Sequence, residues 1–427
     1  MTSKAHGDDR PSPGAALNVY TLACGMPLVV EENRGVGSAA LTWLLPVGSG
    51  ADREDRQGLS TMLSELIFRG AGTLNSRQQA DALDRLGLSR GADVGAAHLR
   101  LSATMLSAKV IDALPLLADM VLRPRFEPDA IEPVRDLSLQ ALQGLKDQPQ
   151  ERGGIMLTER HNHPPLNRSG LGTESGLESI TREELASHWA ARARPGGSIL
   201  AICGNVNGSD IARRLDEVLR GWGGEAPKVE CTASPTRGTY HHEEEQASQV
   251  HIYLAHEAPR ESDPDAVLER IGNAVLSGGS SSRLFTEVRE RRALCYSVHA
   301  WYAADKLWGR VTGYVGTTPD KAQMSLDVMM AELRRMGTRA GAVTPEEFQR
   351  AVVGYKSKLV FAGESTGARA AAIASDLHRL GRPRTLSELA AAIDRVTLDE
   401  LNAYFARRTM GAVTIVTLGP GALKRPE

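Results

Sequence analysis

The stretch that decides the fold is Gly58-Leu-Ser-Thr-Met-Leu-Ser-Glu-Leu-Ile-Phe-Arg-Gly70. Its large apolar side chains recur every three or four residues, as on one face of a helix: Leu59, Met62, Leu63, Leu66 and Ile67. An apolar, β-rich run lies just before it, at residues 38–46, and the segment Pro46-Val-Gly-Ser-Gly-Ala-Asp52 follows that run. This order predicts a strand, a glycine-containing loop and then a helix over residues 58–69.

Further along, the chain contains two similar segments about half its length apart. Thr181-Arg-Glu-Glu-Leu185 precedes the apolar run 198–204, and Thr397-Leu-Asp-Glu-Leu401 precedes the run 413–419. Each threonine is followed three residues later by a glutamate, the capping-box pattern of a helix start. The spacing is 216 residues between the threonines and 215 between the glycines that end the two runs. The repeat predicts an α+β protein with two homologous domains. The alternative is that such signals are common in any α/β chain.

We predict that the two domains occupy residues 16–220 and 239–427. Residues 221–238 contain Gly, Pro, Lys, Ser and Thr without periodicity and are expected to form a linker. Residues 1–15 are mostly polar and are expected to form a disordered tail.

Composition excludes several classes of function. The 427 residues carry a net charge of −2, whereas a nucleic-acid-binding surface needs a basic stripe. No stretch approaches 18 consecutive apolar residues, so no membrane span is expected. The cysteines lie far apart and form no Cys-x-x-Cys pair. They are Cys24, Cys203, Cys231 and Cys295. This usage favours free thiols and a cytoplasmic location.

The helix at 58–69 and its flanks resemble the zinc-site region of pitrilysin- or insulinase-type metallopeptidases, the inverzincins, in their short-chain, processing-peptidase-like branch. In that family the helix carries His-x-x-Glu-His. The frame around the motif is present here, as Gly58-Leu59 before it and the run 66–70 after it. The zinc ligands and the catalytic base of the motif are absent. Thr61 stands at the first His, Ser64 at the Glu that acts as base, and Glu65 at the second His.

The resemblance implies that this chain holds no zinc. A zinc peptidase uses three protein ligands and a water, and neither a threonine hydroxyl nor a serine supplies a ligand or base of the required kind. The family's third ligand is a Glu roughly 75 residues further on. The corresponding position here is Ala141, with Gln140 as the nearest alternative. Neither side chain is a carboxylate.

A second match lies in the other half, in the stretch Gly278-Gly-Ser-Ser-Ser-Arg-Leu-Phe-Thr-Glu-Val-Arg-Glu-Arg-Arg-Ala-Leu-Cys-Tyr-Ser-Val298. In the family, an Arg and a Tyr seven residues apart reach over the zinc site, bind the substrate backbone and stabilise the tetrahedral intermediate. Arg289 and Tyr296 have that spacing. Both side chains are strong donors for a developing oxyanion. The alternative is that Arg289 is a surface charge and Tyr296 a half-buried strand residue.

The resemblance implies a fold of the pitrilysin/LuxS type, in which each domain is a mostly antiparallel sheet of five or six strands flanked by helices. It also implies a function as the non-zinc subunit of a heterodimer. Zinc would sit on a homologous partner with intact His-x-x-Glu-His, and the substrate would be a peptide. Residues 91–101 correspond to the family's substrate-binding edge strand, but with Gly91, Gly95 and His98 in place of polar residues.

Two rival hypotheses stay open. The chain can be an inert, peptide-binding or scaffold pseudoenzyme, or, as a weaker option, a hydrolase using Ser64 and Glu65. Three other motifs favour structural roles. His161 and His163 indicate a loop at a helix end, and the run 241–245 a solvated, charged entry to a strand. Gly278-Gly279 and the serines after them lack the Lys and preceding strand of a phosphate-binding P-loop, so we expect a loop entering a helix.

Overall fold

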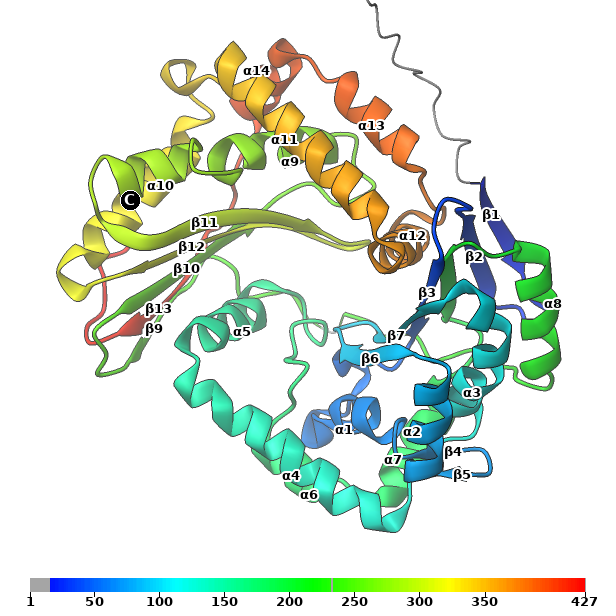
Figure 1. Ribbon diagram of the computed structural model, residues 1–427. Helices are drawn as coiled ribbons and strands as arrows, with labels where there is room; N and C mark the ends of the chain where they lie inside the picture. Colours follow the sequence, from blue (N-terminus) through cyan, green and yellow to red (C-terminus); the bar gives the residue numbers. More distant parts are fainter. Residues whose placement is uncertain (1–15, 232, 427) are drawn as a thin grey trace, which may run out of the picture.

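The computed structural model describes residues 16–231 and 233–426, so the predicted tail at 1–15 lies outside the described residues. The first half is built on a six-stranded sheet in the order β1-β2-β8-β3-β7-β6 (Figure 1). Only the β2–β8 pair is parallel. The strands are β1 Ala16–Thr21, β2 Pro27–Glu32, β3 Ser38–Leu45, β6 Ser89–Val94, β7 Leu99–Leu106 and β8 Ile199–Gly204. A small hairpin joins β4 Gly70–Ala71 to β5 Leu74–Asn75.

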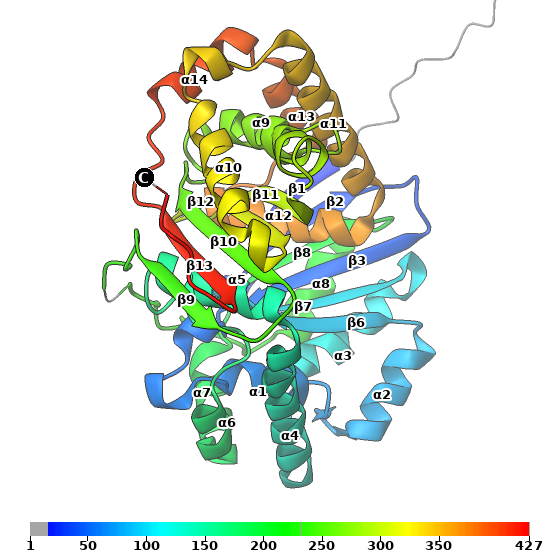
Figure 2. The ribbon, with the colours of Figure 1, turned by 90° about the vertical axis from the view of Figure 1, so that its left-hand side faces the viewer.

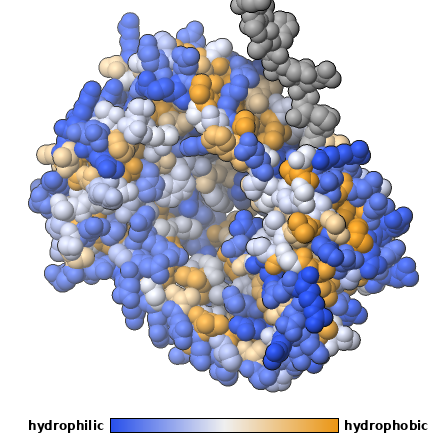
Figure 3. Space-filling view, viewed as in Figure 1, coloured by the Kyte–Doolittle hydropathy of each residue, from blue (hydrophilic) through white to orange (hydrophobic). Residues whose placement is uncertain are grey.

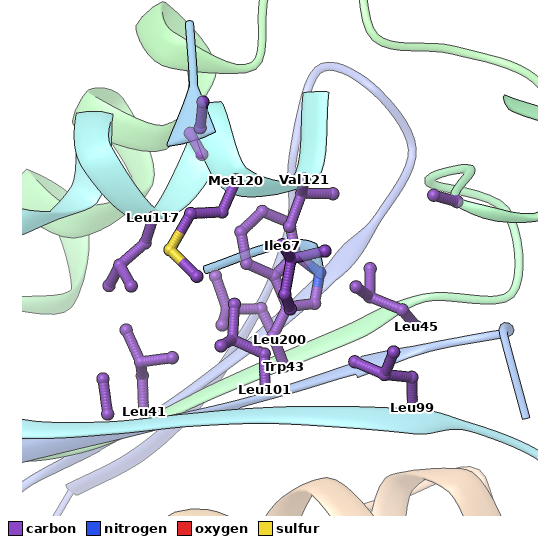
Figure 4. Close-up of a cluster of buried hydrophobic side chains, with 14 of the residues drawn as sticks. Leu41, Trp43, Leu45, Ile67, Leu99, Leu101, Leu117, Met120, Val121 and Leu200 are labelled. Carbon is purple, nitrogen blue, oxygen red and sulfur yellow. The ribbon is translucent and has the colours of Figure 1, made fainter. Parts of the chain in front are cut away.

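Helices pack beside this sheet and enclose its core. They are α1 Leu59–Leu66, α2 Ser76–Arg85, α3 Val110–Leu122, α4 Pro128–Gly144, α6 Glu174–Ser179, α7 Arg182–Arg192 and α8 Gly208–Val218. The first half also contains α5 Pro149–His161, which packs elsewhere. The apolar stripe predicted for α1 is buried, with Ile67 and Trp43 in the same cluster as the α3 side chains (Figure 4). Burial of this stripe against the sheet explains why the stretch 58–70 folds as it does.

The second half repeats this plan with a five-stranded sheet in the order β11-β12-β10-β13-β9. Its strands are β9 Tyr240–Glu244, β10 Val250–Glu257, β11 Cys295–Ala304, β12 Gly309–Thr317 and β13 Thr414–Gly419. Its helices are α9 Ala266–Ser277, a π-helix at Phe285–Glu290, α10 Ala322–Arg335, α11 Pro345–Glu364, α12 Thr366–Leu380, α13 Leu386–Asp394 and α14 Leu398–Arg407. No helix in the described residues combines the length and apolar character needed to cross a membrane.

The two halves share one topology. Five strands of the first sheet, β2-β8-β3-β7-β6, follow the same order as β9-β13-β10-β12-β11 of the second, and the single parallel pair falls at the same place in each. Both predicted capping boxes form, at Thr181 with Glu184 and at Thr397 with Glu400. The prediction of two homologous α+β domains with five- or six-stranded, mostly antiparallel sheets is therefore confirmed.

The halves exchange one helix each. Helix α5 of the first half packs on β10 and β13 of the second sheet, and α12 of the second half packs on β3 and β8 of the first (Figures 1 and 2). Leu157 of α5 is buried with Tyr253 and Leu418, while Ile373 of α12 is buried with Val29. Each sheet thus has one of its faces covered by the other half.

One local prediction is wrong. The run 241–245 lies largely within strand β9, which pairs in parallel with β13, and is not merely a charged entry to a strand. The ring Nδ1 of His242 lies 2.9 Å from Thr417 Oγ1, so a side chain expected in solvent is hydrogen-bonded within the sheet. Hydrophobic periodicity misses this strand because its residues, Tyr-His-His-Glu-Glu, are almost all polar.

Candidate functional site

The four positions of the degenerate motif meet at one cavity. Thr61, Ser64 and Glu65 of α1 and Ala141 of α4 line a cavity of about 790 Å³. Strand β6, helix α5 and the loop around Gly170 complete its wall. Gln140 is not among the described residues that line it, so the cavity side of α4 is the side that carries Ala141.

The hydroxyl groups in this cavity are bonded to the backbone. Thr61 Oγ1 donates to the carbonyl oxygen of Gly170 at 2.5 Å, and Ser64 Oγ donates to that of Thr61 at 2.7 Å. No histidine lines the cavity among the described residues, so Ser64 has no imidazole base there. Activation of a serine needs such a base within hydrogen-bond reach.

The donor set does not fit the zinc that the fold family implies. Of the four motif positions only Glu65 offers a carboxylate, and zinc in peptidases takes three N, S or carboxylate ligands. Elsewhere in residues 16–231 and 233–426, no three His, Cys, Asp or Glu side chains gather closely enough to hold a metal ion.

A buried carboxylate fixes the start of α1. Asp52 accepts hydrogen bonds from the backbone N–H of Gly58 at 2.9 Å and from Ser60 Oγ at 2.6 Å. Gly58 has a φ of 122°, which disfavours any residue with a side chain. Burial raises the pKa of Asp52 to about 6, although these bonds oppose the shift. No local sequence pattern marks Asp52 for this role, since only the fold brings its carboxylate to the helix terminus.

The predicted substrate-binding region, residues 91–101, includes the edge strand β6 and the turn after it. Asp93 pairs with Arg100 at 2.8 Å across the β6–β7 hairpin. The His98 ring packs against another part of the same chain. It contacts the ring of His378 in α12, with 4.6 Å between the ring centroids. Burial and His378 together lower the pKa of His98 to about 4.

The structure brings Arg289 and Tyr296 together. The Arg289 guanidinium lies over the Tyr296 ring, 5.3 Å from its centroid, and over the Phe285 ring at 4.8 Å. The Tyr296 side chain is 83% exposed, so it is not the half-buried strand residue of the alternative interpretation. The neighbouring Arg291 and Arg292 both bind Glu287, at 2.6 Å each, whereas Arg289 has only a 4.0 Å contact with Glu290.

Arg289 and Tyr296 both lie on irregular backbone segments. Arg289 belongs to the π-helix Phe285–Glu290, and Ala293 has a positive φ of 48°. Tyr296 sits at a register shift of β11, because Cys295 pairs with Thr317 and Ser297 with the adjacent Gly316. Such bulges turn a side chain out of the regular pleat, and both bulges and π-helices are frequent at functional sites.

Neither Arg289 nor Tyr296 is among the described residues that line the cavity at α1. The molecular surface is hollowed between the two halves (Figure 3). Within one chain, then, the degenerate motif and the Arg–Tyr pair form two separate sets.

Family comparison agrees with this architecture. A model described as insulinase (peptidase family M16) matches residues 28–174, and one described as peptidase M16 inactive domain matches residues 179–354. This chain belongs to peptidase family M16. The resemblance seen in the motif frame is thereby confirmed over most of the sequence.

Relatives within family M16 align over nearly their whole length. The uncharacterized zinc protease YmxG of Bacillus subtilis is 26% identical over 394 residues, 90% of this chain and 93% of that protein. An uncharacterized zinc protease of Mycobacterium leprae is 26% identical over 430 residues, 99% and 96% of the two chains. Their names refer to zinc, whereas this family M16 member has Thr61, Ser64 and Glu65 in its motif.

Solved structures share the fold. The peptidase M16 inactive domain from Pseudomonas fluorescens superposes with a TM-score of 0.83 at 22% identity, covering 96% of this chain and 99% of that one. A protease from Helicobacter pylori gives 0.82 at 16% identity, covering 95% and 99%.

Proposed function

We propose that this chain is the non-zinc subunit of a two-subunit family M16 peptidase. It supplies Arg289 and Tyr296 to the zinc site of a homologous partner that carries intact His-x-x-Glu-His, and it has no peptidase activity alone. The observation that carries the proposal is the division within one chain: one half has a cavity whose motif positions do not form a zinc-binding set, and the other half has an exposed Arg–Tyr pair.

The geometry of the pair supports a role outside its own chain. Tyr296 is 83% exposed, and the Arg289 guanidinium lies over two aromatic rings and has no carboxylate closer than 4.0 Å among the residues that the structure describes. A guanidinium and a phenol are donors suited to the oxyanion of a tetrahedral intermediate. Each would gain strength when a partner excludes water around it.

The rest of the chain fits a peptide-binding subunit. The edge strand β6 has a free side on which an extended peptide can add as a further strand. We propose that residues 16–220 and 239–427 form the two domains, joined by 221–238. The cysteines are free thiols, which supports the proposed cytoplasmic location.

The experiment is reconstitution with the partner. The homologous chain with intact His-x-x-Glu-His is co-expressed with this one, and the purified pair is assayed on a quenched fluorescent peptide. We expect turnover to need both chains. Arg289→Ala should lower kcat/KM about 100-fold and Tyr296→Phe by roughly tenfold or more, the range found for lost oxyanion donors.

Arg291→Ala is the matched control. It removes the same charge two residues away from Arg289, while Glu287 keeps its contact with Arg292. We expect its kcat/KM to stay close to that of the unmodified pair. Full activity in both Arg289→Ala and Tyr296→Phe would refute the proposed role and leave the inert scaffold as the better account.

A further inference from the structure

A second pocket lies in the other half, between the loop 278–282 and helix α11. Helices α4 and α11 both begin with a proline, Pro128 and Pro345. Counted from these prolines, the three residues of α4 that line the first cavity correspond to three of the six residues of α11 that line the second pocket. Leu137, Ser138 and Ala141 match Gly354, Tyr355 and Lys358. The pocket is therefore the second half's equivalent of the degenerate zinc cavity, with Lys358 at the position of Ala141.

The charges in this pocket are positive. Lys358 and Arg350 both line it, and neither makes an ion pair within 4 Å among the described residues. The one carboxylate in the wall, that of Glu347, is bound by the guanidinium of Arg283 at 2.6 and 2.8 Å. Burial opposes ionisation of Glu347, but hydrogen bonds from Arg283 and the Thr344 backbone, together with the charges of Arg283 and Arg335, lower its pKa. Outside the pocket wall the charge of Arg350 also acts on Glu346, whereas Lys358 has no ion-pair partner within 4 Å in the described part of the chain.

A serine hydroxyl in the wall has no protein partner. Ser282 lines the pocket, and its Oγ makes no hydrogen bond to any described residue. A hydroxyl is a hydrogen-bond donor, so it can bind an oxygen atom of a ligand. Ser281 and Tyr355 also line the pocket.

A glycine in the middle of α11 keeps the pocket open. Gly354 lies inside the helix, where glycine is less stable than alanine by about 1 kcal/mol, and a Cβ built on it would meet no atom within 4 Å. The pocket has a volume of about 100 Å³. A water molecule occupies roughly 30 Å³ in the liquid, so a group of several heavy atoms can enter.

We propose that this pocket binds a small oxyanion, either a phosphate group or a carboxylate such as the C-terminus of a peptide. Lys358 and Arg350 would contact the oxygens of the anion as charged donors, and the Ser282 hydroxyl would donate a further hydrogen bond. No lysine follows Gly278-Gly279 closely in the sequence, because the lysine of this pocket comes from α11, 79 residues after Gly279. The site does not depend on the Arg289–Tyr296 function, and either can fail alone.

The test is calorimetric titration of the full chain with three probes: inorganic phosphate, a short peptide with a free C-terminus, and the same peptide amidated. We expect saturable binding of phosphate, of the free-carboxylate peptide, or of both, and none of the amide. Lys358→Gln should weaken binding by roughly tenfold or more, as for the loss of one charged hydrogen bond. Gly354→Leu should abolish binding by filling the pocket.

Lys356→Gln is the matched control, since Lys356 lies on the same helix but pairs with Asp394 at 2.8 Å outside the pocket. It should bind as the unmodified chain does, and Gly354→Ala reports whether position 354 tolerates a side chain. Phosphate binding alone identifies a phosphate source, and peptide binding alone a terminal carboxylate. The proposal is overturned if no probe saturates up to ~10 mM, or if Lys358→Gln and Lys356→Gln bind equally.

Discussion

One ion pair links the two halves at the level of single residues. Glu31 of β2 and Arg369 of α12 are 4% and 2% exposed, and Arg369 Nε lies 3.0 Å from Glu31 Oε1. The Arg369 guanidinium also donates to the carbonyl oxygen of Arg384 at 3.2 Å. Because both charges are out of water, each depends on the other for its stability.

Glu31→Gln should therefore lower the free energy of unfolding by about 3 kcal/mol, because it leaves the Arg369 charge buried without its partner. The double variant Glu31→Leu with Arg369→Met should lose clearly less, since it removes both charges and keeps the volume. Urea unfolding followed by circular dichroism measures both. Equal losses in the single and double variants would show that packing, not charge, accounts for the effect.

Single residues also show how far the sequence predicts the site. Thr61, Ser64 and Glu65 could be assigned because the frame around them resembles the family's motif. Ala141 is assigned from the family's third-ligand position, with Gln140 as the alternative, and all four side chains line one cavity. Lys358 could not be assigned, since no local pattern links α11 to the loop that it faces. The contact exists only because the two elements pack in the fold.

Among the elements, α5 lies close against the opposite half. It carries two adjacent glycines, and only one of them faces the second sheet closely. A Cβ on Gly153 would lie 2.7 Å from a Tyr253 ring carbon and 2.9 Å from Leu418 Cδ1, whereas on Gly154 its nearest neighbour would be 3.9 Å away.

Gly153→Ala and Gly154→Ala should accordingly have opposite effects. Both gain up to about 1 kcal/mol of helix propensity. Gly153→Ala must also push α5 away from the sheet and should be destabilising by roughly 1–3 kcal/mol, the usual cost of overpacking. Thermal unfolding of the two variants checks this. A stabilised Gly153→Ala protein would mean that α5 moves freely on β10 and β13.

Some elements of the fold can be predicted from local sequence signals, and others cannot. The strand at 38–45, α1 and the two capping boxes carry strong local signals and form as expected. The partners of α5 and α12 carry none, because helical periodicity says that a face is buried but not against which sheet. The π-helix around Arg289 and the bulge at Tyr296 likewise arise from packing and pairing, which a local pattern does not contain.

For the molecule as a whole, buried histidines set the response to acid. Burial lowers the pKa of His161 to about 3 and that of His188 to about 4, and holds the pKa of His256 well below its ordinary 6.5. The folded state keeps these rings neutral, while the unfolded chain takes up protons below pH 6.5. Their contribution to stability is complete above pH 6.5 and is lost as the pH falls toward 4 and below.

The free energy of unfolding should therefore fall between pH 6.5 and 4. Asp52 acts in the other direction, since its pKa of about 6 makes its contribution largest in acid, but one carboxylate opposes several histidines. His161→Gln should reduce the pH slope of stability by about one proton. Urea midpoints measured from pH 7.5 to 4.5 test this, and stability that rises on acidification would contradict it.

The exchange of α5 and α12 also limits how this chain can be divided. Truncation after the linker would strip α5 from the second sheet and expose Tyr253, Val416 and Leu418 to water. It would equally leave α12 without the sheet that covers Ile373. Each half therefore depends on the other for the burial of part of its own apolar surface.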